Sequence, residues 1–393
     1  MRLRWLVATM VLALLVAGCG REVGGPVAGD DAADDTAADD GTADDDTADD
    51  DTAGDGGDAA AGDCEPGTTD GDLLLYNWSD YIAPDLVAAF QDEFGVSVTE
   101  DFYPSNEELL ARVQSGGAQY DVIVPSDYMV AIMIEENLLL ELDRDAIPNL
   151  SNVDDNFADP VYDPGTRFSV PYQWGTTGLG VDLGAIGGDV EPSWALVFDP
   201  EVAGELPGRI SLLDDPRETM GAALYYLGYS PNTTDEGELQ EAADVISGAR
   251  DWTAAFDSDL FADLVLTGET VVSQGYSGGF LDSFGDDEDY AYLIPEEGAT
   301  VWTDTMAILA EAPHPCTAHA FIDFILDAEN GAQLTNWTYY ASPNAAAEEF
   351  IEEEILEDPV IYPTDEAWEN LHFLEDLGDA EILYTDFFTR AKS

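Results

Sequence analysis

The sequence predicts an α/β fold in which two lobes face each other across a ligand cleft. Residues 73–124 alternate between short apolar runs and amphipathic helical stretches in the order βαβαβ, which is typical of a parallel sheet covered by helices. The same alternation starts again near residue 209. The 330 residues from 64 to 393 are enough to build two hydrophobic cores.

Residues that cap or break helices indicate the element boundaries in the first half. Pro84 suits the first turn of a helix and Gly95 stops that helix, while Ser105 and Glu108 fit a capping box at the start of the next one. The expected elements are strands at 73–76, 96–102 and 120–124 and helices at 84–94 and 105–113.

The second half repeats the pattern. Pro216 starts a helix directly after an apolar strand, and the glycines around Tyr276 mark a tight turn from a strand into a short helix. The expected elements are strands at 209–213, 270–273, 290–294 and 305–309, a helix at 216–226 and a long amphipathic helix at 317–337.

Candidate binding residues follow the strands of the predicted sheet. Trp78 comes directly after the first strand, Ser105 after the second, and Ser126 and Tyr128 after the third. Ligands bind beyond the carboxyl ends of parallel strands, so we expect these side chains to meet at one edge of the sheet.

Four short tracts join aromatic rings to carboxylates or bring carboxylates together: 76–81, 126–128, 214–218 and 301–304. Ring faces attract organic ammonium groups, and carboxylates neutralise them with strong hydrogen bonds. Trp302 and Asp304 are two apart on a strand or on the lead-in to the strand expected at 305–309, so they share a face. Asp215 and Glu218 fit either a ligand site or the capping of a helix. The tracts predict a site for a flexible polycation.

The charge of the chain excludes one class of partner. The formal net charge is −73, and acids occur in every segment of residues 64–393. Nucleic acids need basic surfaces, so a nucleic-acid ligand is not expected. Acids spread so evenly, with Lys392 as the one lysine, favour a halophilic or salt-tolerant source.

The N-terminal residues are typical of export. Arg2 and Arg4 precede an apolar run from Trp5 to Val16 that is too short for an ordinary membrane span. The segment Val16–Cys19 resembles a lipobox, which predicts a signal peptide at 1–18 and a lipidated Cys19; the alternative is a plain secreted protein. An Asp-rich segment then predicts a disordered, acidic linker over 19–72.

Two further cysteines, Cys64 and Cys316, form an even pair in an oxidising compartment, so a disulfide between them is one expectation. His314 and His319 flank Cys316, but no further matched ligands lie nearby, and we expect no metal site.

Five motifs occur in order along the chain: Tyr76–Tyr81, Tyr120–Tyr128, Val170–Val181, Leu227–Asp235 and Ser342–Asn344. In this order they resemble the spermidine/putrescine-binding proteins of bacterial ABC importers. The resemblance runs from about Leu73 to Lys392.

The resemblance implies a type II periplasmic-binding-protein fold, with lobe 1 at 73–176 and 303–348 and lobe 2 at 177–302 and 349–393. It also implies a monomer outside the cytoplasm, held to the membrane only by its lipid anchor, that captures a polyamine without a cofactor and delivers it to permease subunits. Tyr276 stands where the family often has Trp, and Leu374 stands near a glutamine of its spermidine binders. The ligand-binding residues that it implies are Trp78, Ser79, Asp80, Tyr81, Ser126, Tyr128, Asp215, Glu218, Tyr276, Trp302, Asp304 and Tyr340.

Two alternatives stay open at this point. Gly275–Gly279 fits the Gly-x-Ser-x-Gly pattern of a nucleophile elbow, which would make Ser277 the nucleophile of a serine hydrolase. The same fold could also bind another organic cation, such as thiamine.

Overall fold

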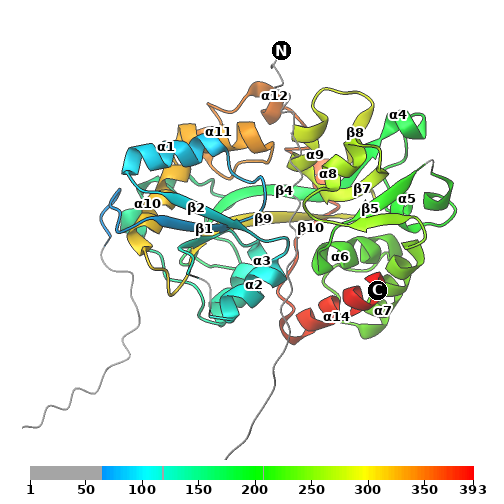
Figure 1. The fold of residues 1–393 in the computed structure, drawn as a ribbon, viewed down its shortest axis with the longest axis horizontal. Helices are drawn as coiled ribbons and strands as arrows, with labels where there is room; N and C mark the ends of the chain where they lie inside the picture. The colour runs from blue at the N-terminus through cyan, green and yellow to red at the C-terminus, as the bar shows by residue number, and fades with distance from the viewer. Residues whose placement is uncertain (1–63, 117–118, 207) are drawn as a thin grey trace, which may run out of the picture. The chain divides into compact units, whose positions relative to one another are not determined.

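The computed structural model describes residues 64–116, 119–206 and 208–393, and this part of the chain has the predicted α/β fold (Figure 1). The predicted signal peptide, Cys19 and the Asp-rich segment up to residue 63 lie outside the described residues. Within the described ranges, no helix is both long enough and apolar enough to cross a membrane.

The strands form one continuous sheet path in the order β2-β1-β3-β9-β4-β7-β5-β6, with β10 beside β9 and β8 beside β4. Two long strands, β4 (Ser169–Asp182) and β9 (Ala299–Ile308), pair antiparallel near the middle of this path. β9 also pairs with β3 (Val122–Ile123), and β4 also pairs with β7 (Thr270–Tyr276). The two long strands therefore connect the two lobes (Figure 1).

Lobe 1 is built on three parallel strands, β1 (Leu73–Asn77), β2 (Val98–Phe102) and β3, in which β1 lies between the other two. Its core contains Leu75, Phe90 and Phe321, all at most 1% exposed. The helices of this lobe are α1 (Pro84–Phe94), α2 (Asn106–Gln114), α3 (Asp127–Glu135), α10 (Pro315–Ile325) and α11 (Ala328–Thr338).

Lobe 2 places β5 (Arg209–Leu212) between β6 (Thr253–Phe256) and β7, with both pairs parallel. Its core includes Ile210 and Leu224. The helices that pack around it are α6 (Pro216–Leu227), α7 (Glu236–Ala249) and α14 (Glu381–Lys392). The shorter elements are α4 (Leu183–Ile186), α5 (Ala195–Phe198), α8 (Phe261–Leu266), α9 (Ser277–Phe284), β8 (Tyr290–Leu293), α12 (Glu353–Leu356), α13 (Asp365–Trp368) and β10 (Leu371–His372).

The prediction of one long helix over 317–337 was wrong in one respect: the structure has two helices, α10 and α11, in this region. Asp327 caps α11 by accepting hydrogen bonds from the backbone N–H groups of Glu329 and Asn330, at 3.0 and 3.3 Å. Apolar residues continue through the break at helical spacing, so periodicity alone did not reveal it.

The sequence analysis also missed β4 and placed the start of β9 too late. Glycines in a strand usually weaken it, and β4 contains three. In the structure they make room for aromatic rings. A Cβ on Gly175 would lie 2.9 Å from the Trp302 ring, and one on Gly180 would lie 2.1 Å from the Phe280 ring. The volume of the neighbouring Trp302 and Phe280 rings therefore explains why β4 contains glycines, which are uncommon in strands.

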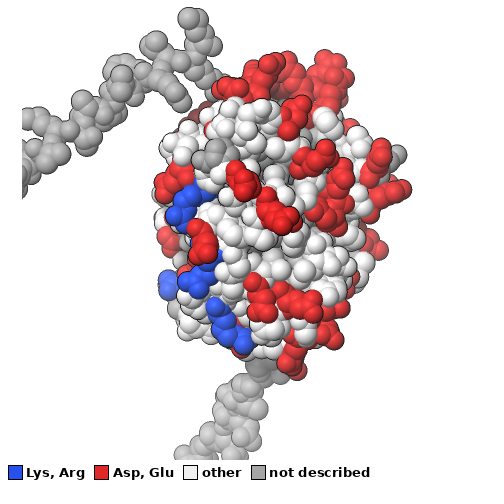
Figure 2. Space-filling model, turned by 90° about the vertical axis from the view of Figure 1, so that its right-hand side faces the viewer, with Lys and Arg blue, Asp and Glu red and all other residues white. Residues whose placement is uncertain are grey.

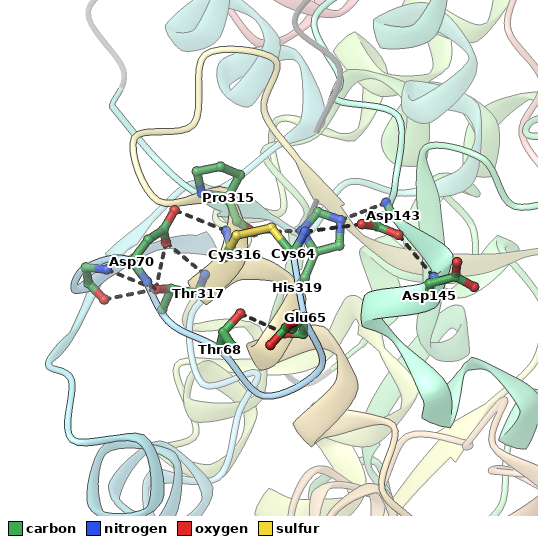
Figure 3. The surroundings of a disulfide bond; sticks show 11 residues. Cys64, Glu65, Thr68, Asp70, Asp143, Asp145, Pro315, Cys316, Thr317 and His319 are labelled. Carbon is green, nitrogen blue, oxygen red and sulfur yellow. Dashed lines mark hydrogen bonds between the residues drawn. A yellow bond between two sulfur atoms is a disulfide. The ribbon is translucent and has the colours of Figure 1, made fainter. Parts of the chain in front are cut away.

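A disulfide joins Cys64 to Cys316 at the start of α10, with 5.3 Å between the two Cα atoms (Figure 3). Nearby, Asp70 accepts a 3.0 Å hydrogen bond from the N–H of Thr317, and the Asp143 carboxylate accepts one of 3.3 Å from the N–H of Cys64. Residues 64–72, which the predicted linker includes, are therefore held against lobe 1.

His319 beside the disulfide has a structural role. Its Nε2 accepts a hydrogen bond from the Asp143 N–H at 2.9 Å, so its Nδ1 donates to the Pro315 carbonyl at 2.6 Å (Figure 3). Burial lowers the pKa of His319, which agrees with a neutral ring that makes both bonds. In the described part of the chain, no group of three or more His, Cys, Asp or Glu side chains could hold a metal ion.

We predict that the double variant Cys64→Ser/Cys316→Ser unfolds at lower urea concentration, with a loss of about 2–4 kcal/mol. The reason is that the disulfide closes a long loop, since its cysteines are 252 residues apart in sequence. Urea unfolding of both proteins measures the difference, and the wild type in reductant should match the double variant. Equal midpoints in oxidised wild type and variant would contradict the prediction.

Candidate functional site

One pocket of about 380 Å³ contains every ligand-binding residue that the sequence analysis named. It draws residues from both lobes and from β9, one of the two long strands that connect them. The predicted residues that line it are Trp78, Ser79, Asp80, Tyr81, Ser126, Tyr128, Asp215, Glu218, Tyr276, Trp302, Asp304 and Tyr340. Leu374 lines it as well.

The pocket residues mostly stand where strands end and helices begin, as the sheet argument predicts. The tract 78–81 follows β1, Ser126 precedes α3, and Asp215 follows β5. Ser105 is different: its hydroxyl caps α2 by accepting from the Glu108 N–H at 3.3 Å, and its neighbour Asn106 lines the pocket instead.

Four aromatic rings form one wall of the pocket. The centroid of the Trp302 ring lies 5.3 Å from that of Tyr340, 5.9 Å from that of Tyr276 and 6.5 Å from that of Tyr81, all edge to face. Edge-to-face packing holds the rings rigidly. The indole N–H of Trp302 donates to Thr177 Oγ1 at 3.2 Å, which fixes the ring across β4.

Trp78 also lines the pocket. Its indole N–H donates to the Val124 carbonyl at 2.9 Å, and its ring centroid lies 4.6 Å from that of Tyr103. These two contacts anchor the Trp78 ring to lobe 1.

Asp304 lies in the middle of β9, and its carboxylate is fixed by lobe 1. Ser126 Oγ donates to Asp304 Oδ1 at 2.6 Å, and Asn106 Nδ2 donates to Ser126 Oγ at 3.0 Å. Burial raises the pKa of Asp304 to about 7, although the hydrogen bond from Ser126 opposes the shift. A buried carboxylate of this kind is stabilised by a nearby positive charge.

Asp215 and Glu218 serve the pocket from the start of α6. Asp215 is also the helix cap that the sequence left open, because its Oδ1 accepts from the N–H groups of Arg217 and Glu218 at 2.9 and 3.0 Å. Glu218 is 7% exposed, and its Oε2 is buried with no hydrogen bond. Burial raises the pKa of both carboxyl groups.

Arg217 is a buried cation beside these acids in sequence, but its guanidinium forms its ion pair and hydrogen bonds with other residues. Its guanidinium pairs with Glu381 and donates to the Glu375 carbonyl at 3.2 Å. It also lies 5.0 Å from the Tyr128 ring centroid and 4.7 Å from that of Tyr384. Among the described residues, no ion pair involves an acid that lines the pocket.

Asp127 is the carboxylate of the tract 126–128, but it was not named among the binding residues, and it lines the pocket. Its carboxylate is 4% exposed and accepts from the N–H groups of Tyr128 and Thr303, at 2.7 and 3.3 Å. Burial raises its pKa to about 7, and the charge of Asp304 adds to the effect. Its place between Ser126 and Tyr128 was a signal in the sequence that could have identified it.

Further acids of the pocket, Asp259, Asp263 and Asp282, come from α8, α9 and the loop before α8. None of these acids belongs to the four tracts that the sequence analysis singled out, so the motif argument did not find them.

Ser277 does not have the surroundings of a nucleophile. It is 1% exposed, it does not line the pocket, and its Oγ accepts a 3.3 Å hydrogen bond from the Thr176 N–H. The ring of His314 lies against Asp121 and that of His319 against Pro315, both in lobe 1.

Comparisons with known proteins agree with this geometry. A model of the family described as bacterial extracellular solute-binding protein matches residues 85–364. A putrescine/cadaverine-binding protein of Pseudomonas aeruginosa is 36% identical, over 79% of this chain and 90% of its own, and a spermidine/putrescine-binding periplasmic protein of Escherichia coli is 33% identical, over 82% and 91%.

The fold also agrees with solved structures. The structure of a putative spermidine/putrescine ABC transporter protein from Listeria monocytogenes superposes with a TM-score of 0.78 at 35% identity, over 82% of this chain and 99% of that one. Such proteins are not enzymes, and neither is this one. The chain belongs to the family of bacterial extracellular solute-binding proteins.

Proposed function

We propose that this protein is the substrate-binding component of an ABC importer and that it captures a polyamine, spermidine or putrescine, in the pocket between its lobes. The observation that carries the proposal is a set of buried carboxylates, Asp127, Asp215, Glu218 and Asp304, that share one ring-lined pocket and form no ion pair among the described residues.

A polyamine fits this pocket chemically. Its ammonium groups are separated by methylenes, so it needs carboxylates at intervals and apolar ring faces between them. The edge-to-face wall around Trp302 presents such faces. Each ammonium over a ring gains about 0.5–2 kcal/mol, and more where water is excluded. The unbonded Oε2 of Glu218 is a free acceptor for an ammonium N–H.

The relatives support the same class of ligand. The Pseudomonas protein is named for putrescine and cadaverine, and the Escherichia protein for spermidine and putrescine. In the proposed cycle the lobes close on the polyamine, and the closed monomer delivers it to the permease subunits.

We further propose that the protein works outside the cytoplasm as a lipoprotein. The basic start at Arg2 and Arg4, the apolar run and the lipobox-like Val16–Cys19 support a lipidated Cys19. Two or more acyl chains anchor a protein stably, so the anchor needs no membrane-spanning helix. The Asp-rich segment before Cys64 would then be the tether.

The acidic surface supports a source of high salinity. Figure 2 shows Asp and Glu over much of the visible face, with Lys and Arg gathered along one edge. A surface of this kind stays hydrated in concentrated salt, where its self-repulsion is screened within a few ångströms.

Calorimetric titration with putrescine, spermidine, spermine and thiamine, at low and at molar salt, tests the proposal. Micromolar or tighter binding of one polyamine that survives molar salt is the expected result. Weak binding of every polycation that vanishes in salt would show that the acids are only a solvated surface. Binding of thiamine without binding of polyamines would change the ligand class.

Asp304→Asn is expected to weaken polyamine binding by about 1.5–3 kcal/mol, the value of a hydrogen bond to a charged group. Asn keeps the shape and can still accept from Ser126, so the charge is what the variant removes. Titration calorimetry measures the loss. Glu311→Gln, at an exposed acid outside the pocket, is the control and should bind like the wild type. Unchanged affinity in Asp304→Asn would remove Asp304 from the site.

Trp302→Ala is expected to cost more affinity than Trp302→Phe, by at least about 1 kcal/mol, because a ring face is what the ligand needs. Phe loses the hydrogen bond to Thr177 but keeps a ring against Tyr276 and Tyr340. The melting temperature of each free variant separates folding from binding. Equal losses of affinity would indicate that Trp302 acts only as a packing residue.

Polyamine binding is expected to release protons at pH 7 and to tighten between pH 5.5 and 8.5. Asp127 and Asp304 have pKa values raised to about 7, so both are largely protonated at pH 5.5, whereas an ammonium stays charged throughout and favours their ionised forms. By the same raised pKa values, the unliganded protein loses stability as the pH rises from about 4, where the unfolded carboxyl groups ionise, to about 7, where the folded ones do.

Calorimetry at pH 7 in two buffers of different ionisation enthalpy counts the released protons. Asp304→Asn should release fewer than the wild type. Identical enthalpies in the two buffers would contradict the view that these carboxyl groups are protonated before the ligand binds.

A further inference from the structure

The motif Leu227–Asp235 contributes no residue to the pocket, but its Asn232 side chain bonds a segment that does. Asn232 Nδ2 donates to the Phe373 carbonyl at 2.9 Å, and Asn232 Oδ1 accepts from the Glu375 N–H at 3.0 Å. The two bonded residues flank Leu374, which lines the pocket. The Asn232 carboxamide therefore holds the backbone on both sides of a pocket residue.

The segment that contains Leu374 has no regular structure of its own. Residues 373–377 lie between β10 and the short 3-10 helix at 378–380, outside the helices and strands. Phe373 and Glu375 are exposed, whereas Leu374 is only 6% exposed. Backbone N–H and C=O groups outside regular structure take side-chain or water partners. Asn232 supplies one donor and one acceptor to this segment, as a neighbouring strand would do.

Arg217 supports the same arrangement from α6. Its guanidinium donates to Asn232 Oδ1 at 3.0 Å and to the Glu375 carbonyl at 3.2 Å. The guanidinium also lies over the ring of Tyr128, which lines the pocket, and over the ring of Tyr384 on α14. The bonds of Asn232 are thus part of a network that reaches the pocket wall.

The backbone around Asn232 is fixed as well. The Tyr384 hydroxyl lies 2.7 Å from the carbonyl oxygen of Pro231 and 2.9 Å from that of Thr233, one on each side of Asn232. Tyr384 itself is fully buried. Asn232 therefore projects from a part of lobe 2 that is held by a buried hydrogen bond.

Leu374 connects this part of lobe 2 to lobe 1. It belongs to a buried cluster whose other members come from lobe 1 and the end of β9, among them Tyr128 and Met129. The chain continues from Leu374 towards α14 in lobe 2. The Leu374 side chain is therefore packed with lobe 1 residues while its backbone neighbours are bonded to lobe 2. In a pocket with several carboxylates, it offers an apolar surface for the methylenes of a ligand.

We propose that Asn232 is a positioning residue for polyamine binding, which holds the segment after β10 so that Leu374 forms part of the pocket wall. This inference rests on the proposed function. Asn232 does not touch the pocket itself, so its effect on the ligand passes through Leu374. Without the carboxamide, the backbone groups of Phe373 and Glu375 would bond water, and the segment would be free to move away from lobe 1.

Affinity measurements on variants of the full chain test this role. Titration calorimetry uses spermidine at 0.15 M salt, or putrescine if the wild type binds it more tightly. Asn232→Ala removes the carboxamide, and Asn232→Gln keeps a neutral amide but displaces it by one methylene. Leu374→Ala and the double variant Asn232→Ala/Leu374→Ala complete a double-mutant cycle, which measures whether the two residues act together.

Asn336→Ala is the matched control. Asn336 also bonds the backbone at two residues of another segment: its Nδ2 donates to the Phe350 carbonyl at 3.2 Å, and its Oδ1 accepts from the Glu352 N–H at 2.9 Å. None of these three residues lines the pocket. The melting temperature of each free variant shows the effect on folding separately from the effect on binding.

Asn232→Ala is expected to weaken binding about fivefold, the effect of one net hydrogen bond on an equilibrium. Asn232→Gln should weaken it similarly. In the Leu374→Ala background, the same Asn232→Ala change should alter the affinity less than twofold, because Leu374 no longer provides the surface that Asn232 positions. Asn336→Ala should lower the melting temperature but bind within twofold of the wild type.

Three results would overturn the role of Asn232 and leave the proposed function standing. They are affinity within twofold of the wild type in both Asn232 variants, an equal loss in Asn336→Ala, or a loss from Asn232→Ala that is as large in the Leu374→Ala background as in the wild type. If the wild type binds no polyamine, the proposed function fails first and the role of Asn232 fails with it.

Discussion

The antiparallel pairing of β4 with β9 is the constraint on which the rest of the structure depends. These two strands run through the middle of the sheet and take partners on both sides, so they join the lobes and also pass beneath the pocket. Trp302 lies opposite Gly175, and Asp304 lies opposite Gln173. Because β9 carries both a ring and a carboxylate of the pocket, a ligand bound there would contact the element that joins the lobes.

The second governing feature is electrostatic. A buried carboxylate without a cation is costly, and it takes up a proton or a counter-ion instead. The pocket contains several such groups, while the nearby Arg217 is already bonded to Glu381 and packed against Tyr128 and Tyr384. The rings around Trp302 line the same pocket. Together these features support the proposed ligand, which supplies several positive charges at once.

Particular residues show how far the sequence could be interpreted. The alternation of strands and helices predicted the edge of the sheet at which Trp78, Ser126 and Tyr128 meet, since carboxyl ends of parallel strands converge. It missed β4, because three glycines in this segment are typical of a loop. The structure shows that aromatic rings occupy the space beside Gly175 and Gly180. The sequence marked the tract 126–128 but did not identify Asp127 as a binding residue, because its burial depends on contact with the distant Thr303. It also did not reveal Asp259, Asp263 and Asp282, which lie outside the four tracts.

The sequence by itself determined the class of fold, the family, and the chemistry of a ring-lined acidic site, because periodicity, turn residues and local motifs are properties of neighbouring residues. Only the tertiary structure decided which acids become buried together, and that Asp215 caps a helix while it lines the pocket. The physical reason is that burial and charge–charge distance depend on contacts between residues far apart in the chain. These contacts raise the pKa values of the pocket acids and leave them without ion-pair partners in the described structure.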